Sequence, residues 1–355
     1  MKPRIVLLIT GLQPGGAENQ VVQLAAELGR RGWEVTLISL ADTFGMRPGV
    51  ADPRALVRLI ALLNRVRPHI LHSHLFHANL MARVVRLFSP APVVISSIHS
   101  IAETGRASGR IGLRDFAYRV TSPLADCTTA VSQAAGDRHA AAGAVRRSKL
   151  RIIPNGVDTA RFRPDPERRA RARSRLGIGA GFVWLAAGRL MWKKDFPTLL
   201  RALAALPGGI LLIAGEGPQE DELRSMARDL AVDARFLGRV ADMPEIMNAA
   251  DALALSSVVE GLPMVLLEAA ASGLPAVATD CGGVREAVRD GATAFVVPPG
   301  DPAALATAMS KLAALPPAGR ESMSRAAREH AARFDLAAVV SQWERLYREL
   351  LERVP

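Results

Sequence analysis

Short apolar runs alternate along this chain with longer stretches in which apolar residues recur every three or four positions. Short apolar runs are typical of buried strands, and the three-to-four spacing is typical of amphipathic helices. In the first half, strands are predicted at residues 4–10, 33–40, 69–73, 92–98, 126–131 and 150–153. Helices are predicted between them, at residues 17–31, 53–66, 76–88 and 132–142.

The second half of the chain repeats this pattern. Its strands are predicted at residues 182–187, 209–214, 233–237, 252–255, 275–278 and 294–297. Its helices are predicted at residues 196–205, 219–230, 242–249, 263–272, 283–289 and 301–314. A last amphipathic stretch, at about residues 335–353, has no strand after it.

This alternation predicts the fold class. Strand–helix–strand units form parallel sheets with right-handed crossovers, so the chain is expected to be an α/β protein with two facing Rossmann-like, doubly wound domains and a cleft between them. We place the N-terminal domain at residues 1–160 and the C-terminal domain at 161–334. The polar, Arg- and Pro-rich segment 154–175 is expected to be the linker, and the helix within 335–355 is expected to fold back on the N-terminal domain.

The composition indicates a soluble protein. The chain has 355 residues, 49% of them hydrophobic, which suits roughly two domains. The apolar run at residues 5–9 is too short for a secretory signal, and no apolar run reaches the ~18 residues that span a bilayer. Cys127 and Cys281 lie far apart and form no metal or redox spacing, which fits a reducing cytoplasm.

The excess of positive charge lies entirely in the first half of the chain. Residues 1–170 contain 24 Lys and Arg against 12 Asp and Glu, whereas residues 171–355 contain 21 against 22. A basic half favours a polyanion or an anionic lipid surface as partner. An Arg-rich genome explains the preference for Arg over Lys but not the asymmetry between the halves. We expect no nucleic-acid partner.

The most informative stretch runs from Glu260 to Glu268. It follows a predicted buried strand, and Gly261 and Pro263 favour a turn into a helix with Pro263 at its first position. The N–H groups at the start of a helix attract phosphate oxygens. The two carboxylates are therefore expected to hold sugar and ribose hydroxyls on either side of a diphosphate. The alternative is a surface turn with a solvated Glu at each end.

A second strand end carries two cations. Gly188 ends the first strand of the second half, and Arg189 and Lys194 flank the short loop that follows. Two fixed cations at a strand end can neutralise a diphosphate leaving group, although a solvated basic loop is the alternative reading. No Asp-x-Asp motif stands at a strand end, so phosphate stabilisation without a metal is predicted.

The remaining strand ends carry weaker signals. The turn at Gly15 and Gly16 lacks the G-x-G-x-x-G fingerprint, which argues against a nicotinamide or flavin cofactor. Gly238 ends a strand where backbone can face a flat base. The histidines near the third and fourth strands have no carboxylate or Cys at ligand spacing. A mixture of core, cap and substrate contacts is expected for His72, His74, His77 and His99, whereas His139 is expected at the surface.

Taken in this order, these motifs resemble the family-4 retaining glycosyltransferases of the GT-B fold, over essentially the whole chain. One departure is Ala294, where the family usually has Gly. The motifs are residues 15–18 (GGAE), 154–158 (PNGVD), 188–190 (GRL) with Lys194, 215–218 (GEGP), 236–238 (FLG), Glu260 with Glu268, and the stretch 280–301.

The resemblance implies roles for individual residues. It implies that Glu260 contacts the donor sugar, that Glu268 contacts the nucleotide ribose, and that Arg189 and Lys194 hold the diphosphate. It also implies that His99 contacts the transferred sugar. The backbone positions implied to bind the donor are Gly16, Gly238, Gly261, Leu262, Pro263, Met264 and Val265.

The resulting hypothesis is transfer of a sugar from a nucleotide-activated donor to an acceptor hydroxyl, with retention and without a metal or other cofactor. By the resemblance, the acceptor is expected to be a polyprenyl-diphosphate-linked glycan. The alternatives are a sugar-nucleotide epimerase, a phosphorylase and a non-catalytic binding module for sugar nucleotides or acidic glycans. A glycosidase needs two carboxylates but neither the cationic loop nor the phosphate-ready helix.

Residues 104–120 interleave Arg with Ile, Leu, Phe, Tyr and Val. Such a segment can bind an anionic membrane, with its apolar residues inserted and its Arg residues on the lipid head groups. The alternative is an amphipathic helix packed on its own domain. We expect a cytoplasmic protein that lies peripherally on the inner face of the cytoplasmic membrane.

Overall fold

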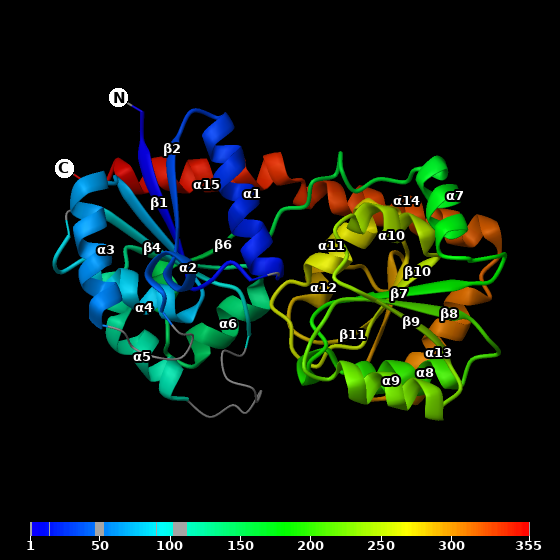
Figure 1. The fold of residues 1–355 in the computed structure, drawn as a ribbon. Coiled ribbons are helices and arrows are strands. Elements are labelled where there is room, and N and C mark those ends of the chain that lie inside the picture. The colour runs from blue at the N-terminus through cyan, green and yellow to red at the C-terminus, as the bar shows by residue number, and fades with distance from the viewer. Residues whose placement is uncertain (1, 14, 47–52, 90, 102–111, 355) are drawn as a thin grey trace. The chain divides into compact units, whose positions relative to one another are not determined.

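The computed structural model describes residues 2–13, 15–46, 53–89, 91–101 and 112–354. The chain forms two compact units. Unit 1 comprises Met1–Gly156 and Ala337–Pro355, and unit 2 comprises Val157–Leu336. Each unit contains a six-stranded sheet in the described part of the chain, with helices packed around it (Figure 1). Every strand pair is parallel, so the predicted fold class of two Rossmann-like units is confirmed.

The sheet of unit 1 has the strand order β2-β1-β3-β4-β5-β6. Its central strands are buried along their whole length, as parallel strands covered by helices are. The strands are β1 (Arg4–Ile9), β2 (Glu34–Ser39), β3 (Ile70–His74), β4 (Val93–Ile98), β5 (Cys127–Ala130) and β6 (Leu150–Ile152). The helices are α1 (Gly16–Arg30), α2 (Leu40–Phe44), α3 (Pro53–Val66), α4 (Phe76–Val85), α5 (Leu113–Thr121), α6 (Gln133–Ala141) and α15 (Leu336–Leu351).

The last helix, α15, packs within unit 1, although it is remote from the rest of the unit in sequence. Its Glu344 accepts hydrogen bonds from Arg31 Nη1 and Trp33 Nε1, both at 2.9 Å. Its Tyr347 is fully buried, and the hydroxyl lies 2.8 Å from Nδ1 of His72 on β3. The helix is therefore part of the core of unit 1.

The sheet of unit 2 has the order β12-β11-β10-β7-β8-β9. Its strands are β7 (Val183–Ala187), β8 (Ile210–Ala214), β9 (Asp233–Gly238), β10 (Ala252–Leu255), β11 (Ala276–Thr279) and β12 (Ala294–Val297). Its helices are α7 (Pro166–Arg175), α8 (Phe196–Ala204), α9 (Glu220–Asp229), α10 (Met243–Ala249), α11 (Met264–Ala271), α12 (Val284–Ala287), α13 (Pro302–Ala313) and α14 (Pro317–Ala331). The core is built from Leu, Ile, Ala and Trp184 on the strands and the facing sides of α8 and α13.

Two sequence-based expectations need correction. The segment 154–175 is not an open linker, because residues 166–175 form α7, which packs against α10. Arg169 and Arg173 of α7 pair with Asp251, and Arg173 also donates to backbone carbonyls. His139 is not a surface residue. It is fully buried on α6, where its Nε2 lies 3.1 Å from the Ser100 carbonyl oxygen.

Each sheet has one place where the strand order reverses. In unit 1 this is between β1 and β3, and in unit 2 it is between β7 and β10. The connections on the two sides of such a point leave toward opposite faces of the sheet, which opens a crevice at the carboxyl ends of the strands. The loops after β7 and β10 are the ones that carry the predicted cations and carboxylates of unit 2.

Candidate functional site

The loops after β7 and β10 are in direct contact in unit 2. The Val258 N–H donates to the Lys193 carbonyl at 2.8 Å, and the Ser256 hydroxyl donates to the Lys194 carbonyl at 2.8 Å. The Lys194 loop is a single 3₁₀ turn, Trp192–Lys194, followed by Asp195 in a left-handed conformation that caps α8. These bonds fix the backbone from which the side chains of Lys194 and Glu260 project.

Glycine is required where neighbouring loops cross. A Cβ atom on Gly282 would lie 2.0 Å from the carbonyl oxygen of Glu260, and Gly282 has a φ of +57°. A Cβ atom on Gly215 would lie 2.0 Å from the carbonyl oxygen of Gly188. The glycines that follow β8 and β11 therefore let their loops approach the two strand ends at the switch point.

Glu260 and Lys194 form an ion pair, with Lys194 Nζ 2.5 Å from Glu260 Oε1. The same oxygen accepts a hydrogen bond from the Ser257 hydroxyl at 2.7 Å. The two side chains are 11% and 22% exposed for Glu260 and Lys194 respectively, so the pair is partly desolvated but reachable. The hydrogen bonds to Glu260 from described side chains all go to Oε1, and Oε2 receives none.

Arg189, unlike Lys194, is not paired with Glu260. Its side chain is exposed and makes no ion pair with any described residue, so the structure does not join it to Lys194 and Glu260. An exposed guanidinium at the carboxyl end of β7 remains available for an incoming anion.

The turn after Glu260 leads into α11, which begins at Met264, with Pro263 as its N-cap. The prediction of Pro263 at the first helical position is therefore off by one residue. No side chain caps this helix, so its first N–H groups, at Met264 and Val265, point outward without an intrahelical acceptor. Gly261 and Leu262 are buried, and the Gly261 carbonyl accepts from the Gly283 N–H at 2.8 Å. This hydrogen bond from the loop after β11 fixes the position of the turn at Gly261.

Glu268 stands in the second turn of α11. Glu268 as a whole is partly exposed, but its carboxyl group is surrounded by protein. Burial raises the pKa of the Glu268 carboxyl to about 7, and the positive charge of Arg161 partly opposes this shift. A carboxyl in such an environment gains strongly from a hydrogen-bonding ligand.

Gly238 stands at another strand end of unit 2, whereas Gly16 and His99 belong to unit 1. Gly238 ends β9 with a φ of +61°, and its carbonyl accepts from the Gly215 N–H at 2.8 Å. Gly16 starts α1 in unit 1, whose N-terminus has no side-chain cap. His99 follows β4 in unit 1, and its Nε2 lies 3.1 Å from Nδ1 of His74 on β3.

Sequence reasoning did not single out Ser257 or the pairing of His74 with His99. Ser257 stands three residues before Glu260. A Ser at that spacing in a turn can hydrogen-bond a nearby group, and this is the sequence signal that indicates its contact with Glu260. The contact between His74 and His99 joins adjacent strands, with the register His74 opposite Ser97. The contact depends on β3 and β4 being neighbours and on their register, neither of which the sequence alone defines.

The thiol of Cys281 lies near Glu260 at this site. Burial raises the pKa of the Cys281 thiol to about 12, and the nearby Glu260 charge adds to that shift, so the nucleophilic thiolate is scarce. In the part of the chain that the structure describes, no group of three or more His, Cys, Asp and Glu is placed to hold a metal ion.

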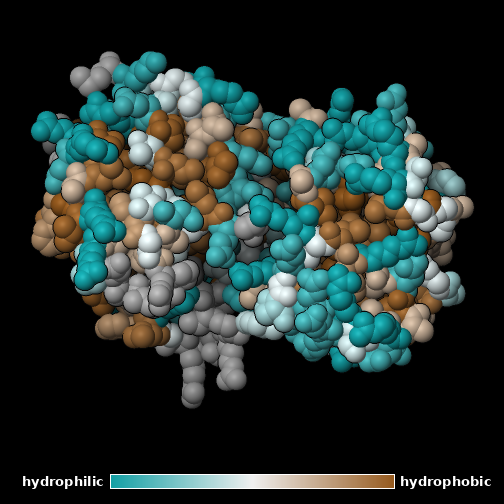
Figure 2. Space-filling model, viewed as in Figure 1, coloured by the Kyte–Doolittle hydropathy of each residue, from teal (hydrophilic) through white to brown (hydrophobic). Residues whose placement is uncertain are grey.

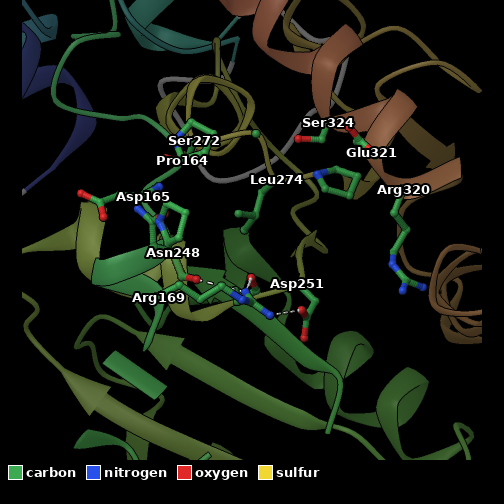
Figure 3. Close-up of a pocket in the computed structure, with 14 residues that line it drawn as sticks. Pro164, Asp165, Arg169, Asn248, Asp251, Ser272, Leu274, Arg320, Glu321 and Ser324 are labelled. Carbon is green, nitrogen blue, oxygen red and sulfur yellow. Dashed lines mark hydrogen bonds and ion pairs between the residues drawn. The ribbon is translucent and has the colours of Figure 1, made fainter. Parts of the chain in front are cut away.

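A separate hollow of about 490 Å³ in unit 2 lies at the opposite edge of the sheet, where the strands begin (Figure 3). It is lined in part by Arg169, Asn248 and Asp251. Arg169 reaches Asp251 Oδ1 at 2.6 Å and the Ala250 carbonyl at 2.7 Å, so these charges stabilise the packing of α7. None of the predicted site residues lines this hollow.

The comparisons with known proteins give the family. The family model described as glycosyl transferases group 1 matches residues 181–314, and that described as glycosyltransferase family 4 matches residues 14–161. Glycogen synthase of Mycobacterium tuberculosis is 33% identical over 299 residues, which cover 79% of this chain and 69% of that protein. The chain belongs to the family-4 glycosyltransferases of the GT-B fold.

Other relatives match this glycosyltransferase in part. A GDP-mannose-dependent α-(1-6)-phosphatidylinositol monomannoside mannosyltransferase of Mycolicibacterium smegmatis is 39% identical over 207 residues, and the match spans 54% of each protein. The chain thus spans about half the length of that relative. A UDP-Gal:α-D-GlcNAc-diphosphoundecaprenol α-1,3-galactosyltransferase of Escherichia coli is 26% identical over 70% of this chain and 67% of that protein.

Solved structures confirm the fold. Anabaena HepE in complex with UDP-glucose has a TM-score of 0.84 at 23% identity, over 98% of this chain and 99% of that one. Sucrose-phosphate synthase of Thermosynechococcus elongatus has a TM-score of 0.85 at 22% identity, over 99% of this chain and 100% of that one.

Proposed function

We propose that this chain transfers a sugar from a nucleoside-diphosphate sugar to an acceptor hydroxyl, with retention of the anomeric configuration. The observation that carries the proposal is the set of charges at the switch point of unit 2. Lys194, Arg189 and the uncapped N-terminus of α11 provide positive charge, and Glu260 and Glu268 provide acceptors for hydroxyl groups. A nucleoside-diphosphate sugar is a ligand whose diphosphate has a hydroxyl-bearing group on each side.

The roles follow from charge. The departing nucleoside diphosphate gains negative charge in the transition state, and fixed cations and helix N–H groups that face it lower the barrier. In the proposed front-face route, an oxygen of the leaving phosphate takes the proton of the acceptor hydroxyl, and the new glycosidic bond forms on the face that the phosphate leaves. No enzymic nucleophile is needed, and no metal is required where protein cations balance the diphosphate.

We propose a lipid-linked glycan as the acceptor. Two of the relatives named above act, by their names, on a phosphatidylinositol mannoside and on a diphosphoundecaprenol-linked sugar. Such acceptors lie at a membrane surface. Among the described helices, none has the length and apolar composition to cross a bilayer, so a peripheral contact on the cytoplasmic side is the proposed arrangement.

Helix α5 offers a surface suited to that contact. Its Leu113, Phe116 and Val120 are 85%, 57% and 60% exposed, and their spacing places them on one side of the helix. Figure 2 shows hydrophobic side chains on the surface over α5. Arg106 and Arg110 of the predicted basic segment lie outside the described residues, whereas the Arg114 guanidinium stacks on the Phe76 ring at 4.7 Å.

The test is a panel of nucleoside-diphosphate sugars, with and without lipid-linked acceptors, with mass spectrometry of the products. We expect release of nucleoside diphosphate that depends on the acceptor, and a product whose anomeric configuration by NMR matches the donor. Activity should persist in a chelator. Donor consumption without acceptor glycosylation would indicate an epimerase or hydrolase instead, and a loss of activity in chelator that a divalent ion restores would contradict the metal-free mechanism.

A further inference from the structure

His330 on α14 joins this helix to the short helix α12, and both helices belong to unit 2. It stands one residue before the end of α14 and is 4% exposed. Its Nε2 lies 3.1 Å from the carbonyl oxygen of Glu286 on α12, and its Nδ1 lies 3.3 Å from Nε of Arg289, just beyond that helix. Both ring nitrogens are therefore used, and both partners belong to one segment of the chain.

These two partners fix the protonation state of His330. A carbonyl oxygen only accepts a hydrogen bond, so Nε2 must carry a proton, whereas a guanidinium only donates, so Nδ1 must be bare. Only the neutral Nε2–H tautomer meets both conditions. Burial lowers the pKa of His330 below its usual range, against the bond to Glu286, and the positive charges of Arg289 and Arg333 lower it further. The ring is therefore neutral at neutral pH.

Helix α12 is too short to be stable by itself. It has four residues, Val284–Ala287, and no side chain caps its N-terminus. A single helical turn gains too few hydrogen bonds to offset the entropy lost in ordering it, so contacts with other elements must hold it. The bond from His330 holds a carbonyl group of the last turn, where backbone carbonyls have no partner within a helix.

The other end of α12 meets the turn that carries Glu260. Gly283, the N-cap of α12, donates its N–H to the Gly261 carbonyl at 2.8 Å. Gly282 lies so close to Glu260 that a Cβ atom on Gly282 would be 2.0 Å from the Glu260 carbonyl oxygen. A shift of α12 therefore moves the backbone next to Glu260.

We propose that His330 is a positioning residue, which holds α12 through its Nε2–H and thereby keeps the Glu260 turn in the geometry that transfer needs. Its part in transfer rests on the proposed function, whereas the link from His330 to the turn rests on contacts within unit 2. The bond to Glu286 carries this link because it holds backbone, whereas Arg289 is an exposed side chain.

The first measurement is the tautomer of His330 in the wild-type protein labelled with ¹⁵N-histidine, by long-range ¹H–¹⁵N correlation at neutral pH. The signals that are missing from the His330→Gln variant identify this residue. We expect a protonated Nε2 and a bare Nδ1. A proton on Nδ1 would overturn the proposal, because the bond to the Glu286 carbonyl would then not exist.

The second measurement compares three variants. In His330→Gln the side-chain amide reaches the position of Nε2 and can donate to Glu286, whereas in His330→Asn it reaches only the position of Nδ1. His330→Leu replaces neither bond. We expect the Gly283 amide to exchange with solvent about tenfold or more faster in the Asn and Leu variants than in the wild type and the Gln variant. Equal exchange in the Gln and Asn variants would overturn the link, and this comparison does not require the Leu variant to fold.

Turnover should follow the same order. We expect kcat to fall about tenfold to hundredfold in His330→Asn and His330→Leu, as for a displaced catalytic group, and to stay within about threefold of wild type in His330→Gln. The KM for the nucleotide sugar should stay nearly constant, so that kcat and kcat/KM fall together. Equal kcat in the Gln and Asn variants, with the wild type active, would overturn the positioning role.

Met323→Ala is the matched control for stability. Met323 is 7% exposed on the same helix, so its truncation leaves a cavity and destabilises the fold. Its kcat should nevertheless stay within about twofold of wild type, since a cavity away from α12 leaves the Glu260 turn in place. A kcat as low as that of His330→Asn would overturn the role of His330. A wild type that transfers no sugar from any donor would instead refute the proposed function, and exchange at Gly283 would still decide the link from His330 to the turn.

Discussion

At the scale of single residues, the proposed chemistry of unit 2 depends on the oxygens of Glu260. Oε1 is held by Lys194 and by Ser257, which leaves Oε2 to face a ligand. The same ion pair also holds the ammonium of Lys194 near the strand end. Because the pair is partly buried, removal of one partner leaves an uncompensated charge and affects the other.

We predict that Glu260→Gln and Lys194→Ala each lower kcat by about 10²–10³, the usual cost of one preorganised contact to developing charge. The double variant should lose much less than the product of the two single losses, because the residues act as a pair. Steady-state kinetics with a fixed donor test this. Lys193→Ala is the matched control, since Lys193 contributes its carbonyl to the loop and its side chain lies over Trp192. Near wild-type turnover in both single variants would show that the site is assigned wrongly.

Arg189 makes a simpler case at the same scale. It is exposed and its side chain supports no other described residue, so Arg189→Ala should leave the unfolding free energy within about 0.5 kcal/mol of wild type. If Arg189 holds the diphosphate, turnover should nevertheless fall by about tenfold or more. Chemical denaturation and kinetics on the same preparation separate the two effects. Unchanged turnover would favour the alternative interpretation, in which Arg189 belongs to a solvated basic loop.

The raised pKa of Glu268 predicts that the unfolding free energy depends on pH. Its folded-state pKa is about 7, above the ordinary value of 4.5. Between these two values the unfolded state is ionised while the folded state keeps its proton, so the stabilising contribution is complete below pH 4.5 and is lost as pH rises to 7. The loss is roughly 1–3 kcal/mol. Urea unfolding at several pH values should show a flatter profile for Glu268→Gln, and the same variant should bind the nucleotide more weakly. Parallel profiles for the two proteins would contradict the raised pKa.

At the scale of secondary-structure elements, the strands were the easiest part to predict. All twelve predicted strands are present in the structure to within about one residue, because most of them are short apolar runs with Gly, Pro or a charged residue at one end or both. The helices with a wide apolar stripe, such as α3 and α8, were predicted equally well.

The helices that the sequence did not reveal lack such a stripe. In α7 only Ala172 is buried, and the helix is held by long-range bonds from Arg169 and Arg173. In α14 the buried positions are mostly Ala and His rather than large apolar residues. The partners of Arg169 and Arg173 in α7 are about 80 residues away in sequence, so a local pattern does not reveal them. The site shows the same limit, since its residue types were predicted but the Lys194–Glu260 contact was not.

The turn that carries Glu260 makes a prediction at the element scale. Gly282 and Gly300 both have positive φ, at +57° and +72°, but a Cβ atom on Gly300 meets no atom within 4 Å. Gly→Ala at either position should cost about 1–2 kcal/mol in unfolding free energy from backbone strain alone. Only Gly282→Ala should also displace the Glu260 backbone, and therefore only this variant should lose transfer activity by more than tenfold. Thermal unfolding and kinetics on the two variants decide this. Equal activity would show that the turn tolerates the displacement.

At the scale of the whole molecule, the basic excess in residues 1–170 coincides with exposed apolar residues on α5. An ordinary helix packed on its own unit would bury its apolar face. In α5 the buried residues are Asp115 and Tyr118, while Leu113, Phe116 and Val120 remain exposed. This reversal favours a membrane contact over simple packing, because apolar side chains gain free energy on leaving water.

We therefore predict that the protein co-sediments with anionic liposomes at low salt and that binding falls as salt is added. Binding should weaken in Leu113→Ser/Phe116→Ser/Val120→Ser, which removes the inserting groups. It should also weaken when Arg106, Arg110 and Arg114 become Ser, since each basic residue near the surface adds about 1 kcal/mol.

The matched control is Val22→Ser/Val57→Ser, which removes two apolar residues that are 46% and 65% exposed on α1 and α3. These residues lie outside the α5 surface, so liposome binding should be unchanged. Equal recovery of the wild type in the soluble fraction with anionic and with neutral liposomes would contradict the membrane contact. A water-soluble acceptor would then be the better proposal, because a lipid-linked acceptor can be reached only by an enzyme at the bilayer surface.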